Sequence, residues 1–362
     1  MELSKFKDII QNAITERNRR LDFLAFRKEL PLAIFGYGNK GKQILNQLGH
    51  IKDKIHIYDL NPLSLNRAHL DGFNIINKVE DLNEFQVILG SGQNQIEQKD
   101  MIFGNHIFYE EATYFYEFIH VQSPARQMSD IISQEIDRFY WLYKILQNES
   151  KQRFIDVLKF RSSLNPSYLQ KTRVNNKLMW LDVPLQFKSR DYKIFLDVGA
   201  FDGDTIKSAR ETFAINRAHA IETNVGLFPK ITEQAKDLAS GLAIYPYAAW
   251  SSNCMLSFSE DHNGMFSIIE SEIGNVCAAT LDSIVLEKVD LIKMDIEGSE
   301  KQALSGCKSL LSSTPDLLIA GYHKPLDFVE IVSNLLEHNS QYTVHFSHYS
   351  DVYDDSILYF IS

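Results

Sequence analysis

The sequence predicts two α/β domains with Rossmann-like parallel sheets, joined by a helical connector. Two observations carry this prediction. Two separate segments each run from a short apolar strand through a glycine-rich turn and a helix to a second strand that ends in an acid, which is the βαβ unit of parallel sheets. The length of 362 residues also favours two domains over one. We expect a smaller N-terminal domain at 1–120, the connector at 121–190 and a C-terminal domain at 191–362.

The first segment places an apolar strand at 32–35 directly before Gly36-x-Gly38-x-x-Gly41, and its second strand ends at Asp59. This context satisfies a dinucleotide fingerprint, in which glycines let the backbone approach phosphates and the acid binds a ribose. Three interpretations stay open. The domain could belong to an NAD(P)-dependent oxidoreductase, could bind a nucleotide or nucleotide-sugar, or could be a Rossmann-like unit that only packs or forms a homodimer.

Between the two segments, six apolar residues recur at steps of four and three. That spacing places them on one stripe of an amphipathic helix, so the connector is expected to be mostly helical. The stripe must pack against the rest of the chain or a second subunit, and packing within the chain is the simpler expectation. The six residues are Met128, Ile132, Ile136, Phe139, Tyr143 and Leu146.

The second segment ends its first strand at Asp197, and its second strand ends in Glu222. The glycine loop from Asp197 to Asp204 holds three acids and no Lys or Arg, so it suits a cationic ligand rather than a polyphosphate. An acid in the position of Glu222 holds ribose hydroxyls in comparable folds. Ala249 and Trp250 follow a third strand and form either an apolar wall for a base or ordinary core. A plain glycine turn capped by aspartate is the simpler alternative for the loop.

The rest of the C-terminal half continues the α/β pattern, with a helix over 328–336. The last strand, 356–361, follows a turn too short for a parallel crossover and must pair antiparallel with its neighbour. A parallel sheet closed by an antiparallel hairpin is the layout of the class I methyltransferase fold. Four further strands are predicted, at 243–247, 289–294, 317–320 and 342–346.

The residues from Lys293 to Glu300, after the fourth strand, resemble the signature of the FkbM-type S-adenosylmethionine-dependent methyltransferases. The resemblance spans roughly residues 190 to 362. It implies S-adenosylmethionine as the cofactor and O-methylation of a hydroxyl, typically of a sugar in a polysaccharide, glycolipid or nucleotide-activated precursor. The N-terminal half resembles, more loosely, a Rossmann-like segment that some members carry. The other matching motifs are 195–205, 280–284, 322–325 and 347–349.

By matching position, the resemblance also implies roles for individual residues. Glu222 would hold the ribose, and Ala249 and Trp250 would flank the adenine. Asp295 and Glu297 would lie at the mouth of the site, between cofactor and acceptor. The methionine end of the cofactor would be lined by Asp197, Gly199, Ala200, Phe201, Asp202 and Gly203.

Transfer to a sugar hydroxyl needs a base, because such a hydroxyl keeps its proton at neutral pH. The candidates at strand ends are Asp295, Glu297, His323 and His348. His323 is favoured, with Asp295 or Glu297 as orienting partner, because an ordinary imidazole pKa of ~6.5 lies near neutrality; a structural histidine beside a turn is the alternative. Glu300 is expected to stabilise a helix dipole. Asp295, Glu297 and His323 could also ligate a divalent ion, but no ligand-spacing motif supports this, and we predict no metal.

The composition excludes several classes of protein. Hydrophobic residues make up 44% and charged residues 23%, which argues against wholesale disorder. The net charge of −10 argues against a nucleic-acid-coating protein, which needs a basic face. No run approaches the ~20 apolar residues of a membrane span, and the first twenty residues lack the apolar core of a signal peptide. Three cysteines are too few for a disulfide framework or a cysteine zinc site. We expect a cytoplasmic protein with no nucleic-acid partner.

Overall fold

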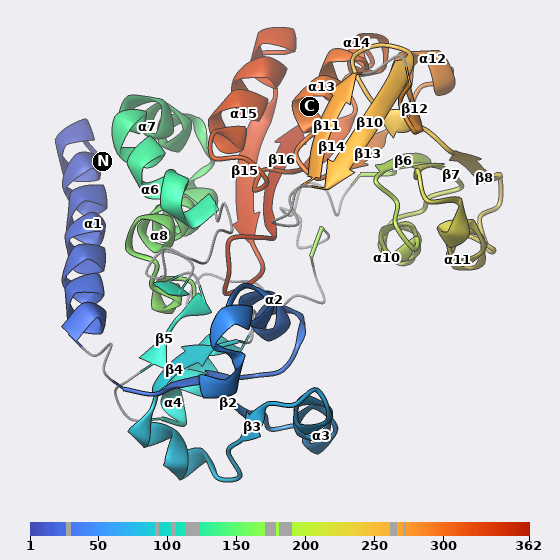
Figure 1. Ribbon diagram of the computed structural model, residues 1–362. Coiled ribbons are helices and arrows are strands. Elements are labelled where there is room, and N and C mark those ends of the chain that lie inside the picture. The colour runs from blue at the N-terminus through green and yellow to red at the C-terminus, as the bar shows by residue number, and fades with distance from the viewer. Residues whose placement is uncertain are drawn as a thin grey trace. The chain divides into compact units, whose positions relative to one another are not determined.

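A computed structural model describes residues 1–26, 30–90, 94–102, 106–109, 111–112, 124–170, 179–180, 190–260, 266–270 and 273–362. The chain divides into two compact units (Figure 1). The first consists of Met1–Tyr140, Gln152–Arg173 and Ser350–Asp354, and the second of Trp141–Lys151, Val174–Tyr349 and Asp355–Ser362. The division at residues 120 and 190 stays a prediction.

The first unit contains a five-stranded sheet of order β3-β2-β1-β4-β5, in which every pair is parallel. The first strand is central and the chain crosses from one edge to the other after β3, as in Rossmann-like folds. The strands are β1 (Leu32–Phe35), β2 (Ile55–Tyr58), β3 (Asn74–Ile75), β4 (Gln86–Leu89) and β5 (His106–Ile107). The helical elements are α1 (Leu3–Phe26), α2 (Asn39–Gln47), η1 (Gly49–Lys54), α3 (Pro62–Leu70), η2 (Val79–Glu84), α4 (Gln95–Asp100), α6 (Pro124–Gln134) and η3 (Pro166–Tyr168).

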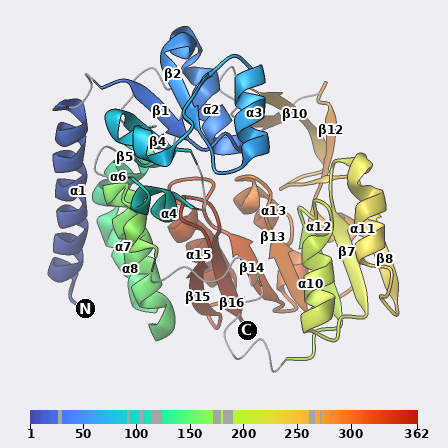
Figure 2. The same ribbon diagram turned by 90° about the horizontal axis from the view of Figure 1, so that it is seen from below.

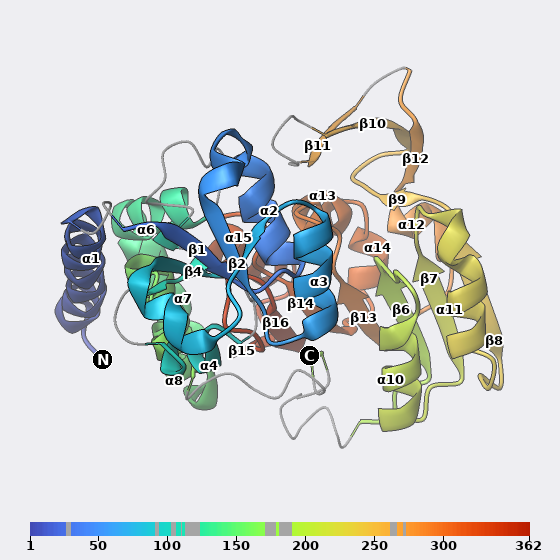
Figure 3. The same cartoon turned by 60° about the horizontal axis from the view of Figure 1, so that its bottom comes forward.

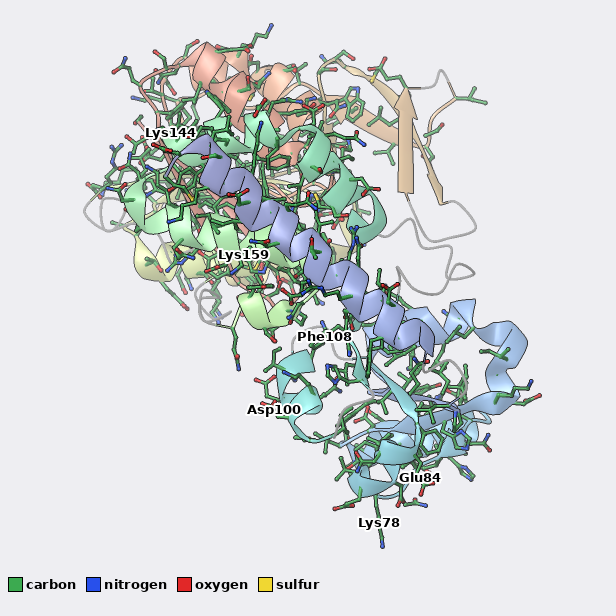
Figure 4. All side chains as sticks on the ribbon, turned by 90° about the vertical axis from the view of Figure 1, so that its left-hand side faces the viewer. Lys78, Glu84, Asp100, Phe108, Lys144 and Lys159 are labelled. Carbon is green, nitrogen blue, oxygen red and sulfur yellow. The ribbon has the colours of Figure 1, made fainter. Side chains whose placement is uncertain are left out.

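Residues of β1 alternate between the two faces of this sheet, as a strand requires. Ile34 belongs to a buried cluster that includes residues of α2, whereas Phe35 belongs to a second cluster that includes Phe108. Figure 4 shows the outer surface of this unit, where the exposed side chains of Lys78 and Glu84 point away from the sheet. The sheet is therefore covered on both faces, as a parallel sheet normally is.

In the predicted connector the structure describes three α-helices, α6, α7 (Ile136–Ile145) and α8 (Asn148–Ser163), with turns and irregular residues after α8. A turn at Glu135 separates α6 from α7, so the predicted stripe runs over two helices rather than one. Ile136 in the stripe is partly exposed, and its other five residues are buried. Among the helices that the structure describes, none is both long and apolar enough to cross a membrane.

The second unit contains a seven-stranded sheet of order β15-β16-β14-β13-β6-β7-β8. Strand β16 lies between β14 and β15 and is antiparallel to both, while the other neighbouring pairs are parallel. This arrangement confirms the predicted parallel sheet with an antiparallel terminal hairpin. The strands are β6 (Ile194–Val198), β7 (Arg217–Ile221), β8 (Gly241–Tyr245), β13 (Leu291–Met294), β14 (Asp316–Ala320), β15 (Thr343–His348) and β16 (Ser356–Ile361).

Helices pack against this sheet through residues that alternate along its strands. Helices α10 and α11 lie side by side in Figure 2 and share a buried cluster with Phe195 and Leu291. Phe328 of α15 packs edge to face on Phe346 of β15, with ring centroids 5.2 Å apart. The helical elements are α10 (Asp204–Thr212), η5 (Val225–Leu227), α11 (Phe228–Gln234), α12 (Leu281–Ile284), α13 (Glu300–Ser305), α14 (Lys308–Leu311) and α15 (Asp327–His338).

A second, four-stranded sheet of order β11-β10-β12-β9 is inserted between β8 and β13 of the second unit (Figure 3). The sequence did not predict it. Its own small core contains Trp250, Leu256 and Ala278. The strands are β9 (Ala248–Ala249), β10 (Cys254–Glu260), β11 (Phe266–Glu270) and β12 (Val276–Ala279).

Candidate active site

A pocket of about 850 Å³ opens in the second unit, beside the carboxyl ends of β6, β7 and β13. This is where open α/β sheets bind their ligands, and the volume is in the range of small-molecule sites. The inserted sheet forms part of the wall. Predicted site residues that line the pocket are Gly199, Phe201, Glu222, Ala249, Trp250, Asp295 and Glu297.

The loop after β6 packs tightly against the residues that follow β13. Gly199 has a φ of +79°, and a Cβ at this position would lie 1.9 Å from the carbonyl oxygen of Asp295. Only glycine allows this approach. Phe201, also at positive φ (47°), is 63% exposed. The glycine therefore brings the cofactor loop and the acidic segment after β13 to one pocket.

Glu222, at the end of β7, organises the same loop. Its Oε2 accepts a hydrogen bond from the backbone N–H of Phe201 at 3.0 Å, and its Oε1 accepts one from Asn224 at 2.7 Å. A carboxylate offers about four lone-pair sites, so acceptors remain for two hydroxyls. The carboxylate is thus fixed in orientation and suited to a ribose diol.

Asp197 is fully buried beneath the pocket and does not line it. Its Oδ1 lies 3.1 Å from Nζ of Lys293, which also donates to the carbonyl of Gly199 at 2.6 Å. Burial raises the pKa of Asp197 to about 6, and the charge of Lys293 offsets part of the shift. Lys293 also lines the pocket and was not predicted from the sequence. Its place two residues before Asp295, which puts both side chains on one face, was the signal that could have identified it.

Three other loop residues predicted to bind cofactor do not line the pocket. Ala200 is buried, Asp202 lies outside the lining, and Gly203 takes a φ of +86° as the residue before α10. On the opposite wall, Ala249 and Trp250 do line it, and the indole Nε1 of Trp250 donates to Glu270 at 2.7 Å. The apolar wall is therefore held by the inserted sheet.

His323 does not line the pocket, but it lies among three carboxylates, two of which, Asp295 and Glu297, do. Its Nδ1 is 3.1 Å from Oε1 of Glu300, and its Nε2 is 3.5 Å from both Oδ1 of Asp295 and Oε2 of Glu297. The hydroxyl of Tyr322 donates to Asp295 at 3.2 Å. The structure therefore brings together the predicted residues Asp295, Glu297 and His323.

These carboxylates change the protonation of His323. Burial by itself lowers the pKa of the imidazole, but the hydrogen bond and charge of Glu300, with smaller contributions from Asp295 and Glu297, raise it to about 9. The role of His323 as base stays a prediction. It was based on the ordinary imidazole pKa, whereas a pKa of about 9 favours the protonated imidazole at neutral pH.

Glu300 has a structural task in addition to the expected one at a helix start. The side chain is 1% exposed, and its Oε1 accepts hydrogen bonds from the backbone N–H groups of Ile296 at 3.0 Å and Gly298 at 3.3 Å. Burial raises the pKa of Glu300, but His323 and the backbone N–H groups of Ile296 and Glu300 outweigh it, so the net shift is downward. Asp295, Glu300 and His323 offer ligand atoms within 4.8 Å of one another, and the contacts among these residues account for the group as an ion-pair cluster.

His348 lies elsewhere. It is fully buried, its Nδ1 is 2.9 Å from Oγ of Ser356, and it does not line the pocket. The structure does not bring this candidate to the acids.

The glycine loop of the first unit has the geometry of its motif. Gly36 has a φ of +115°, and a Cβ at Gly41 would lie 2.0 Å from the carbonyl oxygen of Gly36. Asp59 accepts hydrogen bonds from the backbone N–H groups of Tyr37 at 2.6 Å and Asn61 at 2.7 Å, the pattern that Glu222 makes in the second unit. A nucleotide ligand for this loop stays a prediction.

Comparison with known proteins identifies the domain that holds the pocket. Residues 197–342 match the family model of the methyltransferase FkbM domain. A crystal structure of methyltransferase FkbM from Methylobacillus flagellatus KT matches 99% of this chain and 100% of that chain, with a TM-score of 0.75 and 18% sequence identity. At that identity the match establishes a shared fold. A search of curated proteins finds no match.

Other solved structures match about half of this chain. Fibrillarin from Aeropyrum pernix, crystallised with natively bound S-adenosyl-L-methionine, is 11% identical and matches 48% of this chain and 67% of that chain, with a TM-score of 0.31. Precorrin-6y C5,15-methyltransferase from Geobacter metallireducens GS-15 is 15% identical and matches 52% of this chain and 92% of that chain, also with a TM-score of 0.31.

Proposed function

The chain is a methyltransferase of the FkbM family, with its FkbM domain at 197–342, and from this premise we propose that it transfers a methyl group from S-adenosylmethionine to a hydroxyl group of a sugar. The acceptor sugar would belong to a polysaccharide, a glycolipid or a nucleotide-activated precursor. The observation that carries the proposal is the acid-lined pocket at the strand ends, with Glu222 oriented for a diol.

The residues of the pocket fit this donor. Glu222 would bind the ribose hydroxyls, and Ala249 and Trp250 would form the wall for the adenine. Acids at the other side of the pocket, Asp204 and Asp295, suit a ligand with a sulfonium and an ammonium group. When bound, S-adenosylmethionine supplies an electrophilic methyl group.

The acceptor hydroxyl must lose a proton as it is methylated. Asp295 is placed to accept that proton, since its carboxylate lines the pocket and is partly exposed, while His323 is already protonated. His323 and the hydroxyl of Tyr322 hold the Asp295 side chain in place. The acceptor oxygen would take the methyl group that the bound donor supplies, and the hydroxyl proton would go to a carboxylate oxygen of Asp295.

The test is an assay with methyl-labelled S-adenosylmethionine and a panel of free sugars, glycolipids and nucleotide-sugars. We expect one acceptor class to gain label in an alkali-stable methyl ether, with one S-adenosylhomocysteine formed per methyl group. Asp295→Asn should lower turnover by a larger factor than it lowers the affinity for S-adenosylhomocysteine. Label appearing only on nitrogen or carboxylate acceptors would contradict transfer to a hydroxyl.

A further inference from the structure

The charges that line the pocket are unbalanced. Among the described residues of the lining, four are acids, Asp204, Glu222, Asp295 and Glu297, and one, Lys293, is a cation. The proposed donor carries two positive groups and one α-carboxylate. The acids suit its cations and its ribose, and its carboxylate needs a positive or hydrogen-bond-donating partner. By charge, Lys293 is therefore the candidate partner of the donor's carboxylate.

Lys293 is placed for this task by its strand. The side chain is 5% exposed and lies on β13, paired in register with Asp197 on β6. An ammonium has three N–H donors. Nζ donates one of them to the carbonyl of Gly199, 2.6 Å away, and forms an ion pair with Oδ1 of Asp197, 3.1 Å away. Among the described residues Nζ has no third oxygen partner, and the ring centroid of Trp180 lies 5.2 Å from it.

A helix N-terminus is the usual competitor for an anion, and here it is occupied. Helix α10 begins at Asp204, whose Oδ1 accepts the backbone N–H of Thr205 at 2.7 Å. The first turn of α10 therefore presents a carboxylate to the pocket, which repels a second carboxylate. Lys293 is the one cation among the described lining residues.

Building on the proposed function, we infer that the ammonium of Lys293 binds the α-carboxylate of the methyl donor and so selects ligands that keep this group. Asp197 would act as a positioning residue, since it holds the ammonium at the floor of the pocket without entering it. The pocket would then distinguish S-adenosylhomocysteine from its decarboxylated analogue, which keeps the amine and lacks the carboxylate.

The test removes the cation of Lys293 from the protein and, separately, the α-carboxylate from the ligand. Calorimetric titration of the full-length protein with S-adenosylhomocysteine and with the decarboxylated analogue is carried out for wild type and Lys293→Met. We expect Lys293→Met to weaken the affinity for S-adenosylhomocysteine by about 10- to 100-fold, as for a lost charge-assisted hydrogen bond. The affinity for the analogue should change by less than about twofold. Equal losses for both ligands, or no loss for either, would overturn the inference.

Lys293→Met leaves the buried Asp197 without its cation, which threatens folding. The double variant Asp197→Asn/Lys293→Met removes both charges and should show the same ligand-selective loss. Thermal unfolding of each variant reports whether it is folded. If wild type binds neither ligand, the proposed function fails instead, and that result is distinct from binding without selectivity.

Discussion

His323 and Glu300 form a nearly buried ion pair, with Nδ1 of the imidazole 3.1 Å from Oε1 of the carboxylate. The histidine is 11% exposed and the glutamate 1%. Burial lowers the pKa of His323, but Glu300, with smaller contributions from Asp295 and Glu297, raises it to about 9, and His323 helps to lower the pKa of Glu300 against its burial. In the proposed function, His323 would act as a cation that positions Asp295, and Asp295 would accept the proton.

The pH dependence of methyl transfer should show this assignment. We expect kcat to fall above a pH of about 9, where His323 loses its proton and no longer holds Asp295. Glu300→Gln should move this decline down by about 1–3 pH units, since it removes the nearest opposite charge. Glu337→Gln, at an exposed position of α15, serves as the control and should leave the profile unchanged. A rate that rises through pH 9 would instead identify His323 as the base.

The free energy of unfolding should also depend on the ion pair between His323 and Glu300. The pKa of His323 is raised from 6.5 in the unfolded chain to about 9, so its stabilising contribution is complete below pH 6.5 and is lost as the pH rises through 9. The shift corresponds to about 3 kcal/mol. Urea unfolding of wild type and His323→Gln at pH 6 and pH 9.5 measures it. The stability difference between the two proteins should shrink at pH 9.5; an equal difference at both values contradicts the raised pKa.

Removing the charge of Glu222 should weaken the proposed donor site. Glu222→Gln keeps one acceptor for the loop amides but loses charge-assisted bonds to the ribose, so we expect about a 10- to 100-fold loss of affinity for S-adenosylhomocysteine. Calorimetric titration measures this affinity. Glu211→Gln, an exposed change on α10, is the matched control and should bind as wild type does. Undiminished affinity in Glu222→Gln would remove Glu222 from the site.

Substituting Gly199 should damage the fold of the second unit. In Gly199→Ala the new Cβ meets the carbonyl oxygen of Asp295 at 1.9 Å, at a φ that disfavours side chains, so the free energy of unfolding should fall by roughly 3 kcal/mol or more. Gly38→Ala is the control. It has φ −82° and no atom within 4 Å of the new Cβ, so it should change stability by less than about 0.5 kcal/mol. Denaturant unfolding compares the two, and similar values would contradict the close approach.

Local patterns predicted most of the sheet that holds the site. The strand at 356–361 was predicted with the bounds that β16 has, because a long apolar run beside a short turn leaves one pairing possible. The inserted sheet was missed, since nothing local to β10 distinguishes its strands from loop, and its order depends on pairing between β9 and β12 across the insertion. Helix α1 was also missed, because its apolar residues are interspersed with many charges.

The site residues were predictable by position but not by protonation. Glu222 and Asp295 each follow a strand of the same parallel sheet, and ligands bind at the carboxyl ends of such strands. Both residues line the pocket. Sequence spacing could not show that Asp197 lies beneath the pocket with Lys293, nor that Glu300 reaches His323, because both contacts join different strands or loops. The contact with Glu300 contributes most to raising the pKa of His323. The shift could therefore not be predicted without the folded structure.

The most direct test of the central claim is calorimetric titration of the full-length protein with S-adenosylhomocysteine and, separately, with NADH. The acid-lined pocket of the second unit predicts one-to-one binding of S-adenosylhomocysteine that Glu222→Gln weakens. Binding of NADH with none of S-adenosylhomocysteine would contradict the account.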